Sequence, residues 1–205
     1  MDNVPGTKGY EKVVKQFVEA SQALDFDLVN KDFLNFIPQL ASRILDAGSG
    51  SGQNAAALAQ LGHSVIAVEP FTPFLDAARS TYRNLSITWI EDSLPLLKKL
   101  GNIPSQFDFI LVDGVWHHLG EEERVEGMAR FSSLLCEGGC CALSLRHGPA
   151  GAGKHVFPTD GKRTAALAYQ YGLEVVLCLT NQPSLMKNKP GVTWTRMVLR
   201  KQNSL

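Results

Sequence analysis

Four acidic side chains stand where four short apolar runs of the sequence end. Asp46 closes the first run, just before a glycine-rich turn, and Glu69, Asp92 and Asp113 follow the next three runs. If these runs are parallel strands, their carboxyl ends meet at the edge where open α/β sheets bind ligands. So many carboxylates would repel a pyrophosphate, but they would not repel a nucleoside that carries an amine and a sulfonium. The acids therefore favour a cationic nucleoside as ligand.

A glycine-rich turn over residues 48–52 (GSGSG) joins the first apolar run to a helical pattern. Glycines allow a sharp turn and a close approach of the backbone to a ligand. The dinucleotide fingerprint G-x-G-x-x-G would need glycine where the chain has Gln53, and the turn lacks the lysine of a P-loop. These departures disfavour a dehydrogenase. Glu69, 21 residues after Gly48, is placed to accept hydrogen bonds from both hydroxyls of a ribose.

Short apolar runs alternate with helical patterns through most of the chain, and this alternation predicts how the acids are positioned. Runs rich in Ile, Val, Leu and Phe on both faces are typical of strands buried on both sides. Such strands are predicted over Arg43–Ala47, Ser64–Glu69, Ser86–Ile90, Phe107–Asp113 and Cys140–Leu145. Helices are predicted between them over Gln53–Leu61, Thr72–Tyr82, Ser93–Leu100 and Glu121–Leu135. The pattern predicts an α/β fold with a parallel sheet covered by helices on both faces.

The two ends of the chain depart from this repeat. Near the C-terminus, a helix is predicted over Lys162–Tyr171, followed by strands over Leu173–Leu179 and Val192–Arg200. These two strands have no obvious helix between them, which favours an antiparallel pair at one edge of the sheet. At the N-terminus, helical spacing over Tyr10–Leu24 and Leu28–Phe36 predicts helices that could cover the ligand site as a lid.

Four sequence motifs resemble, in order and spacing, the first four motifs of the class I S-adenosylmethionine (SAM)-dependent methyltransferases. They are ILDAGSGSG, VIAVEP, ITWIEDS and FDFILVDGVWHHL, and the resemblance is close over about residues 40–145. The tail GLEVV…WTRMVLRK fits the sixth and seventh strands of that family. The resemblance implies a doubly wound seven-stranded sheet of order 3-2-1-4-5-7-6, with strand 7 antiparallel and helices on both faces. It also implies one domain over residues 1–205, with an N-terminal helical cap over 1–40 and a Rossmann-like core over 41–205.

The resemblance further implies that the cofactor is SAM and assigns roles to its site. The glycines of the turn would approach the methionine part, and Asp46 would lie near the amino group of that part. Glu69 would hold the ribose hydroxyls, Asp92 with Ser93 would meet the adenine amino group, and Asp113 would border the methyl group. The predicted cofactor site comprises Asp46, Gly48, Ser49, Gly50, Gly52, Glu69, Asp92, Ser93 and Asp113.

Two adjacent histidines follow the fourth predicted strand, where this family often faces the methyl group and its acceptor. Methyl transfer from a sulfonium is an in-line displacement, so the protein must mainly align the acceptor and exclude water. A base helps when the acceptor is a hydroxyl or a protonated amine, and neutral imidazole can take that proton. His117 and His118 are therefore the predicted catalytic residues, and the neighbouring Trp116 is a predicted substrate contact.

An irregular loop follows the fifth predicted strand, again at the ligand-binding edge. It contains Arg146, His147, Lys154 and His155 among glycines and prolines. Arg146, His147 and His155 are predicted substrate contacts, with Arg146 as the anchor because it is nearest the strand. From Arg146 to the C-terminus, nine basic residues face only two acidic ones. This excess leads to the hypothesis that the loop binds an anionic group, such as a carboxylate, on the acceptor.

The composition excludes several classes of protein. Of 205 residues, 44% are hydrophobic and 20% are charged, which is typical of a folded globular domain. The 20 basic and 20 acidic residues cancel, which argues against a chain that coats nucleic acid or an anionic membrane. With no long apolar run and no apolar signal core, a cytoplasmic protein is expected. The four cysteines form no CxxC pair, so we expect free, buried thiols and no metal site.

The leading hypothesis is a SAM-dependent methyltransferase that acts on a small molecule, because the sequence indicates the core fold, a cap and one modest loop. No extra domain for docking a macromolecule is apparent, and no Asn/Asp-Pro-Pro-Tyr motif or Pro-Cys dipeptide indicates a nucleobase substrate. Two alternatives stay open. One is a methyltransferase that docks protein or RNA on its basic C-terminal third. The other is a non-catalytic SAM-binding module.

Overall fold

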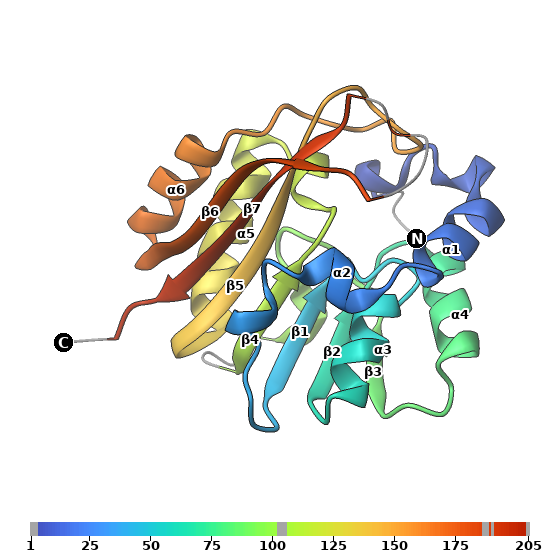
Figure 1. Ribbon diagram of the computed structural model, residues 1–205, viewed down its shortest axis with the longest axis horizontal. Coiled ribbons are helices and arrows are strands. Elements are labelled where there is room, and N and C mark those ends of the chain that lie inside the picture. Colours follow the sequence, from blue (N-terminus) through green and yellow to red (C-terminus); the bar gives the residue numbers. More distant parts are fainter. Residues whose placement is uncertain (1–3, 102–105, 186–188, 190, 204–205) are drawn as a thin grey trace.

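A seven-stranded sheet forms the centre of the chain, and its strand order is β3-β2-β1-β4-β5-β7-β6 (Figure 1). The computed structural model describes residues 4–101, 106–185, 189 and 191–203. The strands are β1 (Arg43–Ala47), β2 (Ser64–Val68), β3 (Ile87–Ile90), β4 (Phe107–Val112), β5 (Leu135–His147), β6 (Leu173–Pro183) and β7 (Thr193–Lys201). The predicted strand order is confirmed.

The strand pairing brings the acidic residues to one edge. Strands β1 to β5 pair in parallel, and β7 runs antiparallel to both of its neighbours, β5 and β6. Ala47 at the end of β1 lies opposite Val68 at the end of β2, and Asp46 lies opposite Leu111 of β4. Because the three central strands end in register, the residues that follow them gather at one side of the sheet.

Helices cover both faces of this sheet (Figure 1). They are α1 (Val14–Gln22), α2 (Phe26–Asn30), α3 (Gln53–Gln60), α4 (Thr72–Thr81), α5 (Glu121–Leu134) and α6 (Gly161–Gln170). Successive strand residues point to opposite faces, so Leu45 packs in the cluster that includes Phe131 of α5, whereas Ile44 packs in the cluster that includes Leu58 of α3. Two apolar layers therefore hold the sheet between the helices. Among the described residues, no helix has the length and apolar character needed to cross a membrane.

The segment over Ser93–Leu100 is not the helix that its pattern predicts. It contains turns and one 3₁₀ turn over Lys98–Leu100. The carboxylate of Asp92 accepts hydrogen bonds from the backbone N–H of Ser93 at 2.8 Å and of Lys99 at 2.6 Å. The bond from Lys99 uses an N–H group that a helix over this segment would give to the carbonyl of Pro95.

Other predicted boundaries shift for identifiable reasons. Strand β5 begins at Leu135, directly after α5, instead of at Cys140, because Leu135 already pairs with Phe107 of β4. The register then shifts before Cys140, in the stretch where Gly138 has a φ of +74°. Helix α1 begins only at Val14, since Tyr10–Lys12 forms a separate 3₁₀ turn. The four cysteines are free, but Cys178 is exposed because it lies on β6, an edge strand.

We predict that alanine is tolerated less well at Gly52 than at Gly62. Both glycines have a φ of the left-handed region, +86° and +93°. A Cβ at Gly52 would lie 2.6 Å from Cη2 of Trp89 and 2.8 Å from Cβ of Ala78, whereas nothing lies within 4 Å at Gly62. Gly62→Ala should cost about 1 kcal/mol of backbone strain, and Gly52→Ala about 1–3 kcal/mol more. Urea unfolding checks this prediction, and equal losses would contradict the packing role of Gly52.

Candidate active site

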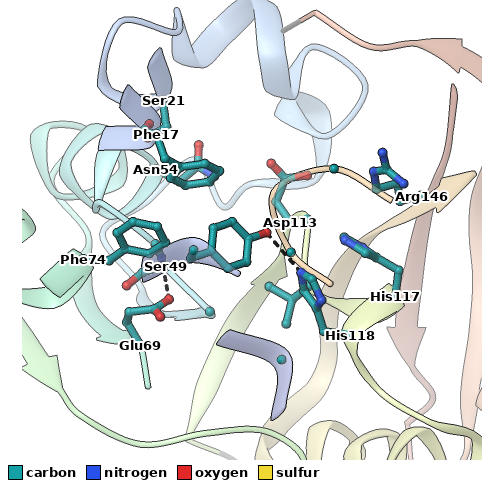
Figure 2. A pocket seen from close by; sticks show the side chains of 18 of the residues that line it. Phe17, Ser21, Ser49, Asn54, Glu69, Phe74, Asp113, His117, His118 and Arg146 are labelled. Atoms are coloured by element: carbon teal, nitrogen blue, oxygen red, sulfur yellow. Dashed lines mark hydrogen bonds between the residues drawn. The ribbon is translucent and has the colours of Figure 1, made fainter. Parts of the chain in front are cut away.

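A cavity of about 340 Å³ opens at the carboxyl edge of the sheet, under the N-terminal segment. Residues that follow β1, β2, β4 and β5 line it from below, and residues of the segment 4–32 line it from the other side. Figure 2 shows Glu69 and Phe74 at one end and His117, His118 and Arg146 at the other. The cavity therefore has an acidic end and a basic end.

The N-terminal helices are fastened directly to the glycine-rich turn and to α3. The Oγ atoms of Ser21 and Ser51 lie 2.6 Å apart, and the Gln22 amide donates to the Ser51 carbonyl at 3.0 Å. The amide of Asn30 donates to Oδ1 of Asn54 at 3.0 Å. These bonds, which the sequence patterns do not reveal, hold the cap over the cavity.

Two buried carboxylates lie at the acidic end: Glu69 lines the cavity, whereas Asp46 is not one of the lining residues and lies behind them, close enough to Glu69 for their charges to interact. Glu69 accepts hydrogen bonds from the backbone N–H groups of Gly50 and Phe71, each at 2.9 Å, yet burial raises its pKa to about 7. Asp46 is 1% exposed, and within the described part of the chain its Oδ2 has no hydrogen-bond partner. Burial, and then the charges of Asp113 and Glu69, raise the pKa of Asp46 to about 8. A cationic ligand would stabilise both carboxylates in their ionised form.

The glycine-rich turn has one side open to the cavity. Gly50 has a φ of +54°, and a Cβ there would meet nothing within 4 Å, so this backbone faces open space. The neighbouring Ser49 is buried, and no partner for its Oγ lies among the residues described. Gly48 packs against Val115 and lines the cavity, whereas Gly52 packs under Trp89, away from it. The structure thus gives Gly52 a packing role in place of the predicted cofactor contact.

Three further predicted cofactor residues line the cavity, but two of them already have partners. Ser93 lines it beside Asp92, whose carboxylate is engaged by the turn described above. Asp113 forms an ion pair with Arg196, with 2.9 Å between Oδ1 and Nη1. The guanidinium of Arg196 also donates to the carbonyl of Val29 at 2.9 Å and lies 4.1 Å from the centre of the Phe33 ring. This one arginine therefore neutralises Asp113 and ties the cap to β7.

In the sequence, Arg196 is one of the nine basic residues of the C-terminal tail, and no motif gives it a site of its own. The signal that could have identified it is a charged residue at a buried position in the strand pattern VTWTRMVLR. A buried arginine needs a partner, and the acids at the sheet edge were already predicted.

His117 is buried in surroundings that keep it neutral. It is 6% exposed, its ring lies 4.1 Å from that of His118 and 6.1 Å from that of Trp194, and no partner for its Nδ1 is found among the described residues. Burial, followed by the neighbouring His118 and Arg146, lowers its pKa to about 2. A ring that resists a proton this strongly is a poor general base, so the structure disfavours the predicted catalytic role of His117.

His118 is held between the cap and the loop after β5. Its Nδ1 lies 2.7 Å from the backbone carbonyl oxygen of His155, and its Nε2 lies 3.2 Å from the hydroxyl of Tyr10. Burial lowers the pKa of His118, and burial and then the charge of Glu69 raise the pKa of Tyr10 to about 12. Tyr10 lines the cavity, although the sequence analysis treated it only as the start of a helix.

Arg146 marks the basic end of the cavity. It is 8% exposed, and its guanidinium donates to the carbonyls of Pro149 at 2.6 Å and Gly148 at 3.3 Å. Among the salt bridges of the described residues it has no carboxylate partner. Burial lowers its pKa, and Lys189 and Trp194 line the same region. An anion entering here would meet an arginine that already lacks a counter-charge.

The remaining predicted substrate contacts lie outside this cavity. Trp116 is fully buried in the core, with its ring 6.1 Å from that of Phe131. His147 bonds the hydroxyl of Thr195 at 2.8 Å, and the ring of His155 packs against Phe157, so that only its carbonyl serves His118. Trp116 and His155 lie in the segments after β4 and β5, whereas His147 is the last residue of β5, where its side chain points to the face opposite that of Arg146. None of the three side chains is among the residues that line the cavity.

Comparisons with known sequences find methyltransferases that are similar to part of this chain. A family model described as a methyltransferase domain matches residues 44–139. An uncharacterized methyltransferase of Anoxybacillus flavithermus is 31% identical over 96 residues, which are 47% of this chain and 43% of that protein. An uncharacterized methyltransferase of Mycobacterium tuberculosis is 30% identical over 118 residues, which are 55% of this chain and 57% of that protein. The chain thus spans about half the length of the curated relatives it matches.

Solved structures share the fold. The 1,6-didemethyltoxoflavin-N1-methyltransferase of Burkholderia thailandensis, with bound 1,6-didemethyltoxoflavin and S-adenosylhomocysteine, superposes with a TM-score of 0.71 at 18% identity, over 96% of this chain and 85% of that one. The [4+2]-cyclase SpnF superposes with a TM-score of 0.74 at 12% identity, over 98% of this chain and 97% of that one. At such identities the likeness shows the fold alone.

We predict that the ligand-free wild type loses stability relative to Asp46→Asn as the pH rises from about 5 to about 7. In this range folded Asp46, with a pKa of about 8, keeps a proton that the unfolded chain, with the ordinary value of 3.8, has lost. The contribution of Asp46 to stability therefore decreases with rising pH, by up to about 1.4 kcal/mol per pH unit. The lowered pKa values of His117 and His118 act with the opposite sign, but they are common to both proteins. Urea unfolding measures the difference, and Asp27→Asn, which alters an exposed acid, should keep the wild-type dependence. Parallel curves for Asp46→Asn and the wild type would contradict the burial of this proton.

Proposed function

We propose that this chain, which belongs to the class I SAM-dependent methyltransferases, binds SAM in the cavity and transfers its methyl group to a small molecule. The observation that carries the proposal is the buried carboxylate of Asp46, with one oxygen lacking a partner among the described residues, beside Glu69. A ligand with an ammonium and a sulfonium supplies the positive charge that these groups lack.

The residues present fit such a cofactor. Asp46 would attract the ammonium group, while the open backbone at Gly50 leaves room for the methionine part. Glu69 uses one hydrogen bond at each oxygen, so each oxygen can still accept a ribose hydroxyl. Asp92 and Ser93 border the region assigned to adenine, with Phe71 and Phe74 as flat apolar neighbours. When bound, the cofactor supplies an electrophilic methyl group on a sulfonium.

The cap and the loop after β5 then have the task of aligning the acceptor and excluding water. Both segments line the cavity, and the backbone N–H of Lys154 donates to the carbonyl of Lys8 at 2.9 Å, which joins them. A site closed in this way suits a small acceptor better than a macromolecule. The toxoflavin-type methyltransferase with the same fold gives a precedent for a small acceptor.

Arg146 supports an acceptor that carries an anionic group. Its guanidinium is buried at the cavity wall and held by two carbonyls, which orient it without neutralising it. A carboxylate or similar anion would form a charge-assisted pair with it. Lys154 does not contribute in this arrangement, because it is exposed and donates to the carbonyl of Gly151.

A non-catalytic SAM-binding module is the second candidate, because the fold alone does not imply methyl transfer: SpnF, which has the same fold, is named for a different reaction, a [4+2] cyclisation. The two candidate functions, methyl transfer and SAM binding without catalysis, are distinguished by incubating the protein with SAM and a pool of small acids. Formation of S-adenosylhomocysteine supports methyl transfer, whereas SAM binding without turnover favours the second candidate. Tight RNA binding with a steep salt dependence would instead favour a macromolecular substrate.

We predict that Glu69→Gln weakens SAM binding about tenfold to hundredfold, because the two hydrogen bonds from the ribose hydroxyls lose their negatively charged acceptor. Isothermal titration calorimetry measures the dissociation constant. Glu122→Gln, which removes an exposed acid on α5, is the matched control and should bind as the wild type does. Undiminished affinity in Glu69→Gln would remove Glu69 from the site.

We also predict that Arg146→Met abolishes a preference for anionic ligands at the basic end. In protein saturated with S-adenosylhomocysteine, benzoate should bind more tightly than its neutral analogue benzamide. Arg146→Met should weaken the binding of benzoate about tenfold and leave the binding of benzamide unchanged. Lys154→Met, from the same loop, is the control. Unchanged benzoate affinity in both variants would refute the role of Arg146 in binding an anion.

A further inference from the structure

We propose that Nε2 of His118 receives the proton of the methyl acceptor, and that the hydroxyl of Tyr10 occupies this nitrogen until the acceptor replaces it. The inference rests on the proposed methyl transfer and identifies the chemical class of the acceptor. It follows from the hydrogen bonds on the two sides of one imidazole ring.

The backbone carbonyl of His155 determines the tautomer of His118. A carbonyl oxygen can only accept, so at 2.7 Å the Nδ1 atom of His118 must carry the hydrogen. Burial keeps the ring neutral by lowering its pKa, so Nε2 has a free lone pair. The Tyr10 hydroxyl, 3.2 Å from Nε2, must therefore donate to it.

Tyr10 belongs to the cap and reaches His118 across the cavity. Its ring packs edge-on against Phe17 at 5.1 Å and Phe74 at 5.5 Å between ring centres. Gly153 is tightly placed against both partners, since a Cβ there would lie 2.7 Å from Cε1 of His118 and 2.9 Å from Cε2 of Tyr10. The contact is thus built from three segments, the cap, the turn after β4 and the loop after β5. All three line the cavity, so an acceptor that enters it can displace the hydroxyl without unfolding a strand or helix of the sheet layers.

His118 is better suited to this role than His117. Both ring nitrogens of His118 have a hydrogen-bond partner, which fixes the orientation of the ring. By contrast, Nδ1 of His117 has no partner within the described residues, and the pKa of the His117 ring is lowered to about 2. A base needs a defined lone pair aimed at the place where the proton leaves. Among the two predicted histidines, the geometry supplies this only at His118.

The acceptor group that fits is a neutral hydroxyl, as on a phenol or an alcohol, whose O–H takes the place of the Tyr10 hydroxyl. Its O–H bond breaks and the proton moves to Nε2. The oxygen electron pair forms the bond to the methyl carbon, and the carbon–sulfur bond breaks with its electrons on sulfur. The products are a methyl ether, S-adenosylhomocysteine and protonated His118, which returns its proton to solvent after release. A carboxylate as the methylated group would need no base and would leave this nitrogen without a role.

The first test is nuclear magnetic resonance of ¹⁵N-labelled histidine in the whole protein. The wild type should show His118 protonated at Nδ1 and unprotonated at Nε2 at neutral pH, and Tyr10→Phe should keep this tautomer because the His155 carbonyl sets it. His118→Gln assigns the signal. The opposite tautomer would overturn the proposal, whether or not any cofactor binds.

The second test uses phenol and anisole, which differ in the O–H that His118 would accept. Tyr10→Phe frees Nε2 and should tighten the binding of phenol about fivefold, the equivalent of one hydrogen bond. The binding of anisole should stay the same in this variant. Tyr169→Phe, which alters an exposed ring, is the control and should leave the binding of phenol unchanged. The gain should vanish in the double variant with His118→Gln. Equal changes for phenol and anisole, or no gain for phenol, would overturn the proposal. Neither test requires S-adenosylhomocysteine, so the two proposals can fail separately. A wild-type protein that does not bind S-adenosylhomocysteine would refute the proposed function and would leave the outcome of these two tests unaffected.

Discussion

The structure depends on one electrostatic constraint, which is that parallel strands ending in register bring several carboxylates to one buried edge. Asp46 lies near the end of β1, and Glu69 and Asp113 directly follow the two adjacent strands, so that the charges of Glu69 and Asp113 disfavour ionisation of Asp46. Burial adds to this effect, because removing a carboxylate from water is costly unless it gains a partner. Each of the three acids must therefore be compensated, and the compensation differs at each one.

The protein compensates two of the acids itself. Arg196 pairs with Asp113, and two backbone N–H groups bond to Glu69. Within the described residues, Asp46 keeps an oxygen without a partner. Because the charge of Asp46 is not compensated within this part of the chain, a positively charged ligand is expected to bind near this carboxylate. The same arginine bonds the cap at Val29, so the balance of charge and the covering of the cavity depend on a single side chain.

The sequence predicted the sheet, the glycine-rich turn and the acids well, because these follow from local patterns of apolar runs and turns. It did not predict Tyr10 or Arg196 as cavity residues, since their partners lie 108 and 83 positions away and no periodicity encodes such contacts. The predicted helix over Ser93–Leu100 failed for a local reason, the capture of backbone donors by Asp92. The sequence predicted the strands near Trp116, His147 and His155, but it did not predict that their side chains lie outside the cavity lining, because side-chain direction depends on the register of a strand and on the dihedral angles of the loop after it.

The two ends of the cavity explain each other once the movement of charge is followed. In the proposed reaction, methyl transfer to a hydroxyl would remove a positive charge near Asp46 and Glu69 and create one on His118. That new charge arises near Arg146, whose own charge helps to lower the pKa of His118. An anionic group on the acceptor, bound by Arg146, would offset this repulsion at the moment the proton arrives. A hydroxyl for His118 and an anion for Arg146 are therefore one requirement, and they describe an acceptor that carries both groups on a small framework.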